Sequence, residues 1–163
     1  MNDYSCYFPF DCPALHTCLP TCTASNFMMM AYPMYTTERR NSRDLRYNEF
    51  TIVETGSFNN YSVLDAMDLD YNNISTISSE TFVGLENLQQ INLGYNRIST
   101  LTTGTFVGFG YLRTINLQNN RLNKIEDGAI EDLQNLYYLY LQNNDISVID
   151  NTTFPYLPRL NRL

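Results

Sequence analysis

The chain has 163 residues, 44% of them hydrophobic, and a formal net charge of −7. This hydrophobic share supports a packed core and argues against wholesale disorder, and the length allows one domain or one short solenoid. The negative charge disfavours nucleic acid or an anionic membrane as the partner, because phosphate binding needs clustered Lys and Arg.

The N-terminal segment holds all the cysteines of the chain, at Cys6, Cys12, Cys18 and Cys22. A tight, even-numbered cluster at one end predicts a disulfide-stapled cap in an oxidising compartment, with three possible pairings. Zinc is the rival interpretation because His16 is nearby, although the spacing contains no C-x-x-C pair. We therefore interpret residues 1–39 as an N-terminal cap, whose methionines at 28–30 fill its core or offer a surface for assembly.

This segment resembles neither a membrane span nor a secretory signal. Its longest apolar run is far shorter than the ~20 residues that cross a bilayer, and it lacks the basic and then apolar order of a signal peptide. The basic patch that follows, Arg39, Arg40, Arg43 and Arg46, is interrupted by Asp44 and is predicted to be solvated surface.

The rest of the chain repeats one pattern, which places an asparagine every 24 residues, at Asn48, Asn72, Asn96, Asn120 and Asn144. The spacing around each is close to L-x-x-L-x-L-x-x-N-x-L, which is typical of a leucine-rich repeat. The predicted repeats are 40–63, 64–87, 88–111, 112–135 and 136–159, and residues 160–163 open a sixth. The first has Arg40 and Arg43 in place of leucines and is interpreted as an edge repeat.

Each repeat is predicted to form one turn of a coil. Apolar and polar residues alternate before the asparagine with the period of a strand that buries one face. The asparagine follows the strand, where its amide can satisfy buried backbone groups turn after turn. Phe82, Phe106 and Phe154 fill the back of the coil, and Ile130 replaces them once. A single repeat cannot bury its apolar face alone, so the repeats must stack.

From about Cys12 onward, the chain resembles the extracellular leucine-rich-repeat family of Toll-like receptors, Slit, small leucine-rich proteoglycans and variable lymphocyte receptors. CPALHTCLPTC at 12–22 and FMMMAYP at 27–33 are similar to the N-terminal cap of that family, although the cysteine spacing departs from it. The resemblance implies the pairs Cys6–Cys18 and Cys12–Cys22. It also implies an α/β-type repeat solenoid: a horseshoe with short parallel strands on the concave face and an irregular or 3₁₀ convex side.

In this fold the outward strand positions form the concave face. Their side chains are not needed for the core, which the buried Leu and Ile residues supply. It begins acidic, becomes rich in amides and ends with tyrosines, which favour contacts because they give large area at low entropy cost. The predicted ligand-binding residues are Asp44, Arg46, Asp68, Asp70, Asn92, Asn116, Gln118, Tyr138, Tyr140 and Gln142. Of these, we expect Tyr138, Tyr140 and Asn116 to act as anchors.

Two features of this face admit more than one interpretation. Tyr47, Tyr71 and Tyr95 precede the asparagines on strands about 4.8 Å apart, so they form either an intramolecular ladder or an aromatic binding strip. Three carboxylates, at Asp44, Asp68 and Asp70, are the ligands calcium prefers. A flat sheet does not wrap six ligands, however, so the prediction is an acidic surface with no metal and no cofactor.

A protein-binding module is the leading functional hypothesis, because a curved solenoid offers an extended concave surface. As the resemblance implies, the partner is an extracellular protein, with a glycan or matrix component as the lesser option. Catalysis is disfavoured, since the only histidine lies among the cysteines and leaves no Ser–His–Asp arrangement. Sequons at Asn60, Asn73 and Asn151 add support for secretion.

The alternative is a structural subunit that stacks end to end. No C-terminal cysteine cap follows LPRLNRL at 157–163, and a solenoid that ends on a bare repeat exposes a core cross-section. Either the chain is a fragment of a longer protein, or another surface covers Leu157, Leu160 and Leu163. A contact of the second kind makes rings or open filaments.

Overall fold

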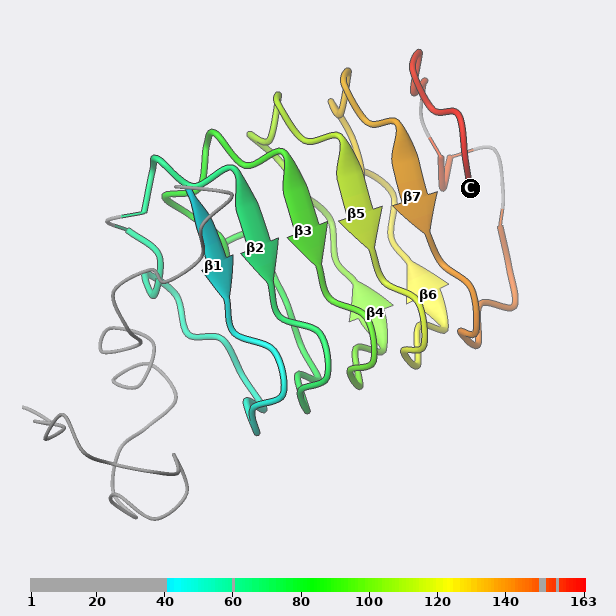
Figure 1. Ribbon diagram of the computed structural model, residues 1–163. Coiled ribbons are helices and arrows are strands. Elements are labelled where there is room, and N and C mark those ends of the chain that lie inside the picture. Colours follow the sequence, from blue (N-terminus) through cyan, green and yellow to red (C-terminus); the bar gives the residue numbers. More distant parts are fainter. Residues whose placement is uncertain (1–40, 60, 150–151, 155) are drawn as a thin grey trace, which may run out of the picture.

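The computed structural model describes residues 41–59, 61–149, 152–154 and 156–163, which form a coil of successive turns (Figure 1). The described strands are short: β1 (Ser42–Asp44), β2 (Ala66–Asp68), β3 (Gln90–Asn92), β4 (Thr100–Leu101), β5 (Thr114–Asn116), β6 (Lys124–Ile125) and β7 (Tyr138–Tyr140). The cap cysteines, Asn60 and Asn151 lie outside the described residues.

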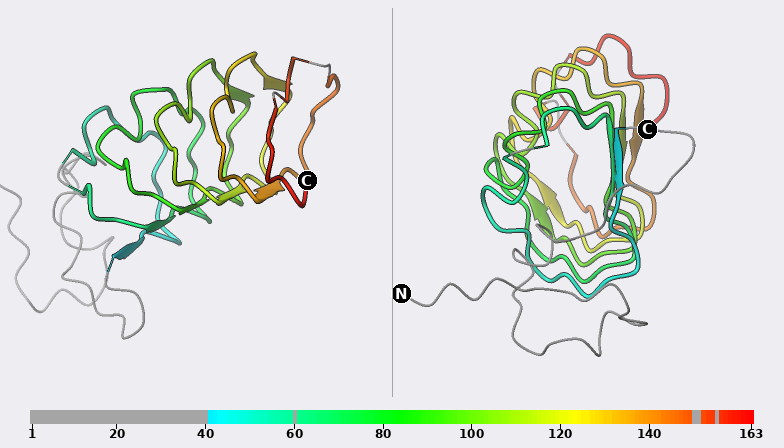
Figure 2. Two further views of the ribbon diagram at one scale, coloured as in Figure 1. Left: turned by 90° about the horizontal axis from the view of Figure 1, so that it is seen from above. Right: turned by 60° about the vertical axis from the view of Figure 1, so that its left-hand side comes forward.

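One parallel sheet runs along the coil in the order β1-β2-β3-β5-β7. Its register advances by one repeat at each step, since Met67 pairs with Ile91 and Ile91 pairs with Ile115. Figure 2 shows the turns fanning out more widely opposite this sheet, which therefore lines the concave side. The predicted solenoid with short parallel strands on its concave face is confirmed.

The convex side is irregular. The described residues there contain turns but no 3₁₀ helix, and β4 and β6 form a two-stranded parallel pair. The described residues also contain no helix that is long and apolar enough to cross a membrane.

The hydrophobic core runs along the coil between the sheet and the back. Leu69, Leu93 and Leu117 are fully buried behind the sheet, and burying one such side chain contributes about 1.5–3 kcal/mol. At the back, the Phe82 ring stacks between those of Phe58 and Phe106, with centroids 6.1 and 6.4 Å away. This repeated burial explains why the apolar positions recur with so little variation.

The first turn shows how arginine can occupy a leucine position. Arg43 pairs with Met67 in the sheet and is half-buried. Its guanidinium donates to the Tyr61 hydroxyl at 2.9 Å and lies 5.0 Å from the centre of that ring. The prediction of solvated surface is therefore wrong for Arg43, because its guanidinium lies over the Tyr61 ring and bonds the hydroxyl of that residue. Arg39 and Arg40 lie outside the described residues.

The last turn is less well covered than the central ones. Ile149 occupies the column of Leu101 and Ile125, yet it is 56% exposed, against 0% and 7% for the other two. Phe154 is only partly buried. The prediction that this turn matches the core of the others is therefore only partly met, because no described residue covers the outer side of Ile149.

Candidate binding face

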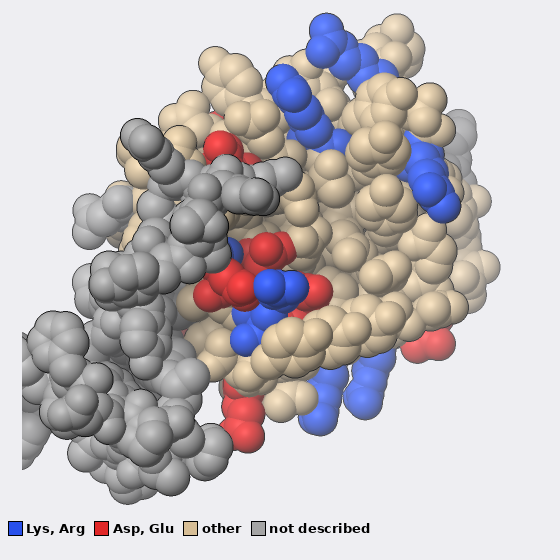
Figure 3. All heavy atoms as spheres, viewed as in Figure 1, with Lys and Arg blue, Asp and Glu red and all other residues tan. Residues whose placement is uncertain are grey.

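The concave side presents a wall of polar and aromatic side chains. They come from alternate positions on β1, β2, β3, β5 and β7, while the positions between them enter the core. Figure 3 shows acidic side chains gathered over β1 and β2, with the face beyond them free of acidic side chains as far as β7. The wall is therefore charged unevenly along the coil.

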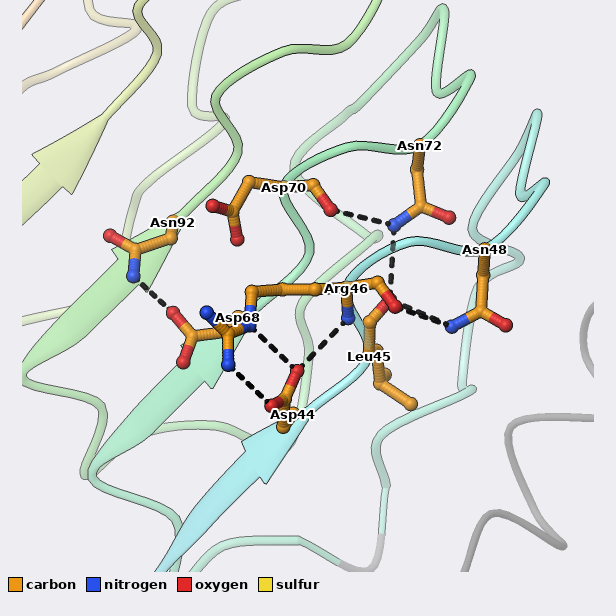
Figure 4. A network of polar contacts seen from close by, with 8 residues as sticks. All are labelled: Asp44, Leu45, Arg46, Asn48, Asp68, Asp70, Asn72 and Asn92. Atoms are coloured by element: carbon orange, nitrogen blue, oxygen red, sulfur yellow. Dashed lines mark hydrogen bonds and ion pairs between the residues drawn. The ribbon is translucent and has the colours of Figure 1, made fainter.

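The acidic end is organised around one arginine. Arg46 forms an ion pair with Asp44 at 2.7 Å and donates a second bond to it from Nε at 2.9 Å. Figure 4 shows its guanidinium between the carboxylates of Asp44 and Asp68. The hydrogen bond from Arg46 holds the pKa of the Asp44 carboxyl below its ordinary value. Asp68 accepts a hydrogen bond from the Asn92 amide on the next strand.

Asp70 is the least satisfied carboxylate of this group. Its Oδ1 is buried and has no hydrogen-bond partner among the described residues. Partial desolvation raises the pKa of Asp70, and the nearby charge of Asp68 adds to this effect. No group of three His, Cys, Asp or Glu side chains among the described residues is arranged to hold a metal ion.

The middle of the wall carries no charge, and its side chains are short or half-buried. Asn92, Asn116 and Gln118 are half-buried, and the Asn116 side chain accepts a bond from the Gln118 backbone at 3.1 Å. Gly94 stands where the neighbouring turns carry Asp70 and Gln118, and it is buried. This part offers amide donors and acceptors without net charge.

Tyrosines and an arginine form the C-terminal end. Tyr138 and Tyr140 stack with their centroids 5.9 Å apart and their planes 6° from parallel. Tyr137 meets Tyr138 edge to face at 4.7 Å. Arg162 pairs with Tyr138 as the start of a sixth strand, and its guanidinium lies 5.7 Å from the centre of the Tyr140 ring. Gln142 follows on the same turn and is exposed. We name Tyr137, Tyr138, Tyr140 and Arg162 the tyrosine cluster.

The tyrosine column before the asparagines is a stacked ladder. The Tyr71 ring lies 4.6 Å from Tyr47 and 4.3 Å from Tyr95, with planes within 20° of parallel. Asn119 and Asn143 continue the column, and Asn143 donates to Asn119 at 2.9 Å. Because the faces of Tyr71 are occupied by its neighbours, the ladder has mainly ring edges and hydroxyls left to offer a ligand. This geometry favours the intramolecular interpretation over the binding strip.

Buried asparagines fix the turn beneath this ladder. Asn72 donates to the carbonyl of Leu45 in the preceding turn at 3.0 Å and to that of Leu69 in its own turn at 2.9 Å. It also accepts from the N–H of Phe50 at 3.2 Å. The same bonds recur at Asn96 and Asn120, so each asparagine ties two turns together. These bonds connect the chain that follows each wall strand to the turn before it.

A hollow of about 500 Å³ lies on the back of the first three turns, away from the concave wall. Its lining is rich in hydroxyls, including those of Thr55, Ser75, Thr76, Ser99 and Thr100. Glu54 is the only ionisable residue among those that line it. Its lining therefore combines hydroxyl groups with one carboxylate and contains no pair of opposite charges.

The structure assembles the predicted ligand-binding residues on one wall, and it adds Arg162 to them. This arginine lies 24 residues after Tyr138, so extending the outward strand positions by one more repeat would have predicted it. Asn73, the one sequon asparagine among the described residues, is half-buried on the turn after Asn72. The cysteines, Asn60 and Asn151 cannot be placed on the described fold.

Comparison with known proteins supports the fold directly. The sequence profile of the leucine rich repeat matches residues 44–98, 64–122 and 110–163. These segments together cover most of the chain. No curated protein sequence matches it significantly.

Solved structures give the same result. The chain is similar to TLR13 in a TLR13–ssRNA13 complex (27% identity, TM-score 0.61, 72% of this chain and 20% of that one). It is also similar to internalin C2 of Listeria monocytogenes (28%, TM-score 0.54, 68% and 46%). The leucine-rich-repeat domain of APL1B shares the fold (22%, TM-score 0.68, 74% and 34%). The chain thus spans between a fifth and a half of these proteins.

Proposed function

Because the chain belongs to the leucine-rich-repeat family, a fold commonly used for protein binding, we propose that it is an extracellular protein-binding module that recognises its partner through the concave wall. The tyrosine cluster is the observation that carries this proposal. Its rings lie on the wall and leave the core position of the strand to Leu139, which lies between Tyr138 and Tyr140 and is fully buried. Aromatic and arginine side chains are the most frequent anchors of protein interfaces.

The chemistry of the wall favours a protein over a nucleic acid. The solved TLR13 structure is a complex with ssRNA13, a single-stranded RNA. In this chain the wall carries Asp44, Asp68 and Asp70, and the net charge is −7, so a polyphosphate would be repelled from one end. Mixed aromatic, amide and charged groups suit a protein surface, with Tyr138, Tyr140 and Asn116 as proposed anchors and Asp68 and Asp70 steering a basic partner.

Secretion and the absence of catalysis belong to the same proposal. Disulfides among Cys6, Cys12, Cys18 and Cys22 and glycans at Asn60, Asn73 and Asn151 would form in the secretory pathway. The proposed role needs no cofactor, metal or membrane insertion of this chain. It rests on surface complementarity and not on a reaction.

A capture experiment tests the proposal. The wild-type chain, a Tyr138→Ser/Tyr140→Ser variant and a Val83→Ser/Val107→Ser control are each immobilised and exposed to extracellular fluid of the source organism. Val83 and Val107 are exposed at equivalent positions away from the sheet, so the control removes apolar surface without touching the wall. We expect proteins identified by mass spectrometry to be retained by the wild type and the control and lost by the tyrosine variant. Equal retention by all three would contradict concave recognition.

End-to-end assembly is a second candidate, and the exposure of the last turn favours it. Val148 and its neighbour Ile149 are 69% and 56% exposed, and Leu163 is 57% exposed; contiguous exposed apolar patches mark interaction sites. If they join copies of the chain, the solution mass measured by light scattering rises with concentration under non-reducing conditions. An Ile149→Ser/Leu163→Ser variant then stays monomeric. A constant mass near 18.9 kDa for the wild type rules this candidate out.

A further inference from the structure

We infer that the concave wall takes a protein segment crossing the strands in one orientation, with a basic residue over β1 and β2 and an acidic residue next to an aromatic one over β7. This inference rests on the proposed function and specifies the chemistry of the partner. The charge difference between the two ends of the wall carries it.

The first end has more negative charge than it can neutralise itself. Within the described part of the chain, Asp44, Asp68 and Asp70 face a single cation, Arg46, and that cation is bonded to Asp44. Among the described residues, Asp68 accepts a side-chain hydrogen bond only from the Asn92 amide, and Asp70 has a buried oxygen without a hydrogen-bond partner. A lysine or arginine of the partner would bring donors to the Asp68 carboxylate and a positive charge close to Asp70, and charge-assisted bonds are the stronger kind.

The other end has the opposite need. Arg162 rests over the Tyr140 ring and takes part in no ion pair with a described residue. A guanidinium stacked on an aromatic face keeps its N–H edge free for a carboxylate, which it binds in a two-pronged geometry. The stacked rings of Tyr138 and Tyr140 beside it suit an aromatic or apolar side chain.

The distance between the two ends fits a short segment. From β2 to β7 the sheet steps through β3 and β5, and three spacings of about 4.8 Å make roughly 14 Å. An extended chain covers that distance in about four to five residues. Between the ends, Asn92, Asn116 and Gln118 can bond a peptide backbone without regard to its side chains. Nucleic acids, acidic polysaccharides and anionic lipid surfaces carry negative charge alone and do not match both ends.

A displayed peptide library supplies the probe. Random twelve-residue peptides are first depleted on the Tyr138→Ser/Tyr140→Ser variant and then selected on the wild-type chain. We expect enriched peptides with a lysine or arginine about four to five residues from an acidic residue that adjoins an aromatic one. Dissociation constants of a selected peptide are then measured with Asp68→Asn/Asp70→Asn and with Arg162→Gln, each against a matched control, Asp145→Asn or Arg97→Gln.

Each charge variant should weaken binding about two- to fivefold, the size of an exposed ion pair, while the controls leave it unchanged. The effect of Asp68→Asn/Asp70→Asn should vanish when the basic residue of the peptide is replaced by Ala. The effect of Arg162→Gln should vanish when its acidic residue is replaced. The inference is overturned if the Asp68→Asn/Asp70→Asn effect does not depend on the basic residue of the peptide. It is also overturned if the Arg162→Gln effect does not depend on the acidic residue.

The outcomes also separate this inference from the proposed function. Peptides that require the tyrosines but show neither the spacing nor the charge coupling overturn the orientation and leave concave binding in place. Selected peptides that bind the Tyr138→Ser/Tyr140→Ser variant as tightly as the wild type overturn both the orientation and concave binding.

Discussion

The hydrogen bonds of the buried Asn96 side chain determine how much free energy of unfolding is lost when this residue is replaced. Asn96 is 7% exposed, and its amide donates to the carbonyls of Leu69, Leu93 and Gly94 at 3.0 to 3.1 Å. Its oxygen accepts from the N–H of Ile74 at 3.0 Å. Alanine removes all of these bonds at once and leaves the backbone groups buried, where each unsatisfied one costs about 1–3 kcal/mol.

We therefore expect Asn96→Ala to lower the free energy of unfolding by about 2–4 kcal/mol. The control is Asn123→Ala, at an exposed asparagine, which should stay within about 0.5 kcal/mol of the wild type. Urea denaturation followed by circular dichroism measures both. Similar values for the two variants would contradict the role of Asn96 as a tie between turns.

Asp70 should make stability depend on pH. Its pKa in the folded chain is raised above the ordinary value of 3.8 by partial desolvation, so its charged form is disfavoured by folding. Above that raised pKa the charge destabilises the fold, and the penalty fades as pH falls towards 3.8. Asp70→Asn should thus raise the thermal midpoint at pH 7 and lose that advantage near pH 3.5. Asp145→Asn, at an exposed aspartate, should show no such pH-dependent gain, and a destabilising Asp70→Asn at pH 7 would contradict the assignment.

Among the structural elements, the tyrosine ladder combines an unfavourable backbone with favourable stacking. Tyr47, Tyr71 and Tyr95 have φ values of 56°, 56° and 52°, a left-handed conformation that residues other than Gly, Asn and Asp rarely adopt. Asn119 and Asn143 take the same conformation in later turns, at φ 54° and 57°. The tyrosines are therefore retained there at a conformational cost that the stacking of the rings offsets.

Tyr71→Ala should consequently destabilise the fold more than Tyr47→Ala. The two positions share the same φ, so the backbone cost of alanine is matched, but Tyr71 stacks on two rings and Tyr47 on one. The expected difference is about 0.5–1.5 kcal/mol, the value of one aromatic pair. Tyr71→Asn should recover part of the loss, because asparagine tolerates this conformation. Equal losses for both alanine variants in denaturant unfolding would show that the second ring contributes nothing.

The sequence predicts these elements unevenly. The strand register follows from it, because Met67, Ile91 and Ile115 must all enter one core and a one-residue slip would turn them outwards. The contacts of the wall do not follow, since nothing in the spacing tells Arg46 to bond Asp44 in preference to Asp68. Similarly, the packing of Arg43 on Tyr61 depends on side-chain directions that a one-letter pattern does not contain. The ligand roles of the wall residues stay predictions.

At the scale of the whole molecule, burial is graded along the coil. Each turn contacts only its neighbours, so stability is close to a sum of turns and the interfaces between them. Ile125 lies between two described turns and is 7% exposed, whereas Ile149 in the same column is 56% exposed. The last turn should therefore open locally at a lower free energy than the centre.

Ile125→Ala and Ile149→Ala measure this gradient with the same chemical change. Deleting the buried side chain should cost about 2–5 kcal/mol, because a cavity remains. The exposed one should cost under about 1 kcal/mol, because little surface leaves water there. The pair should be compared by denaturant unfolding at two protein concentrations at least a hundredfold apart. If copies of the chain cover the last turn, the cost of Ile149→Ala grows with concentration, since association stabilises the folded chain by mass action. A small cost at both concentrations fits a monomer that uses only its concave wall, and a large cost at the lower concentration would contradict the graded burial itself.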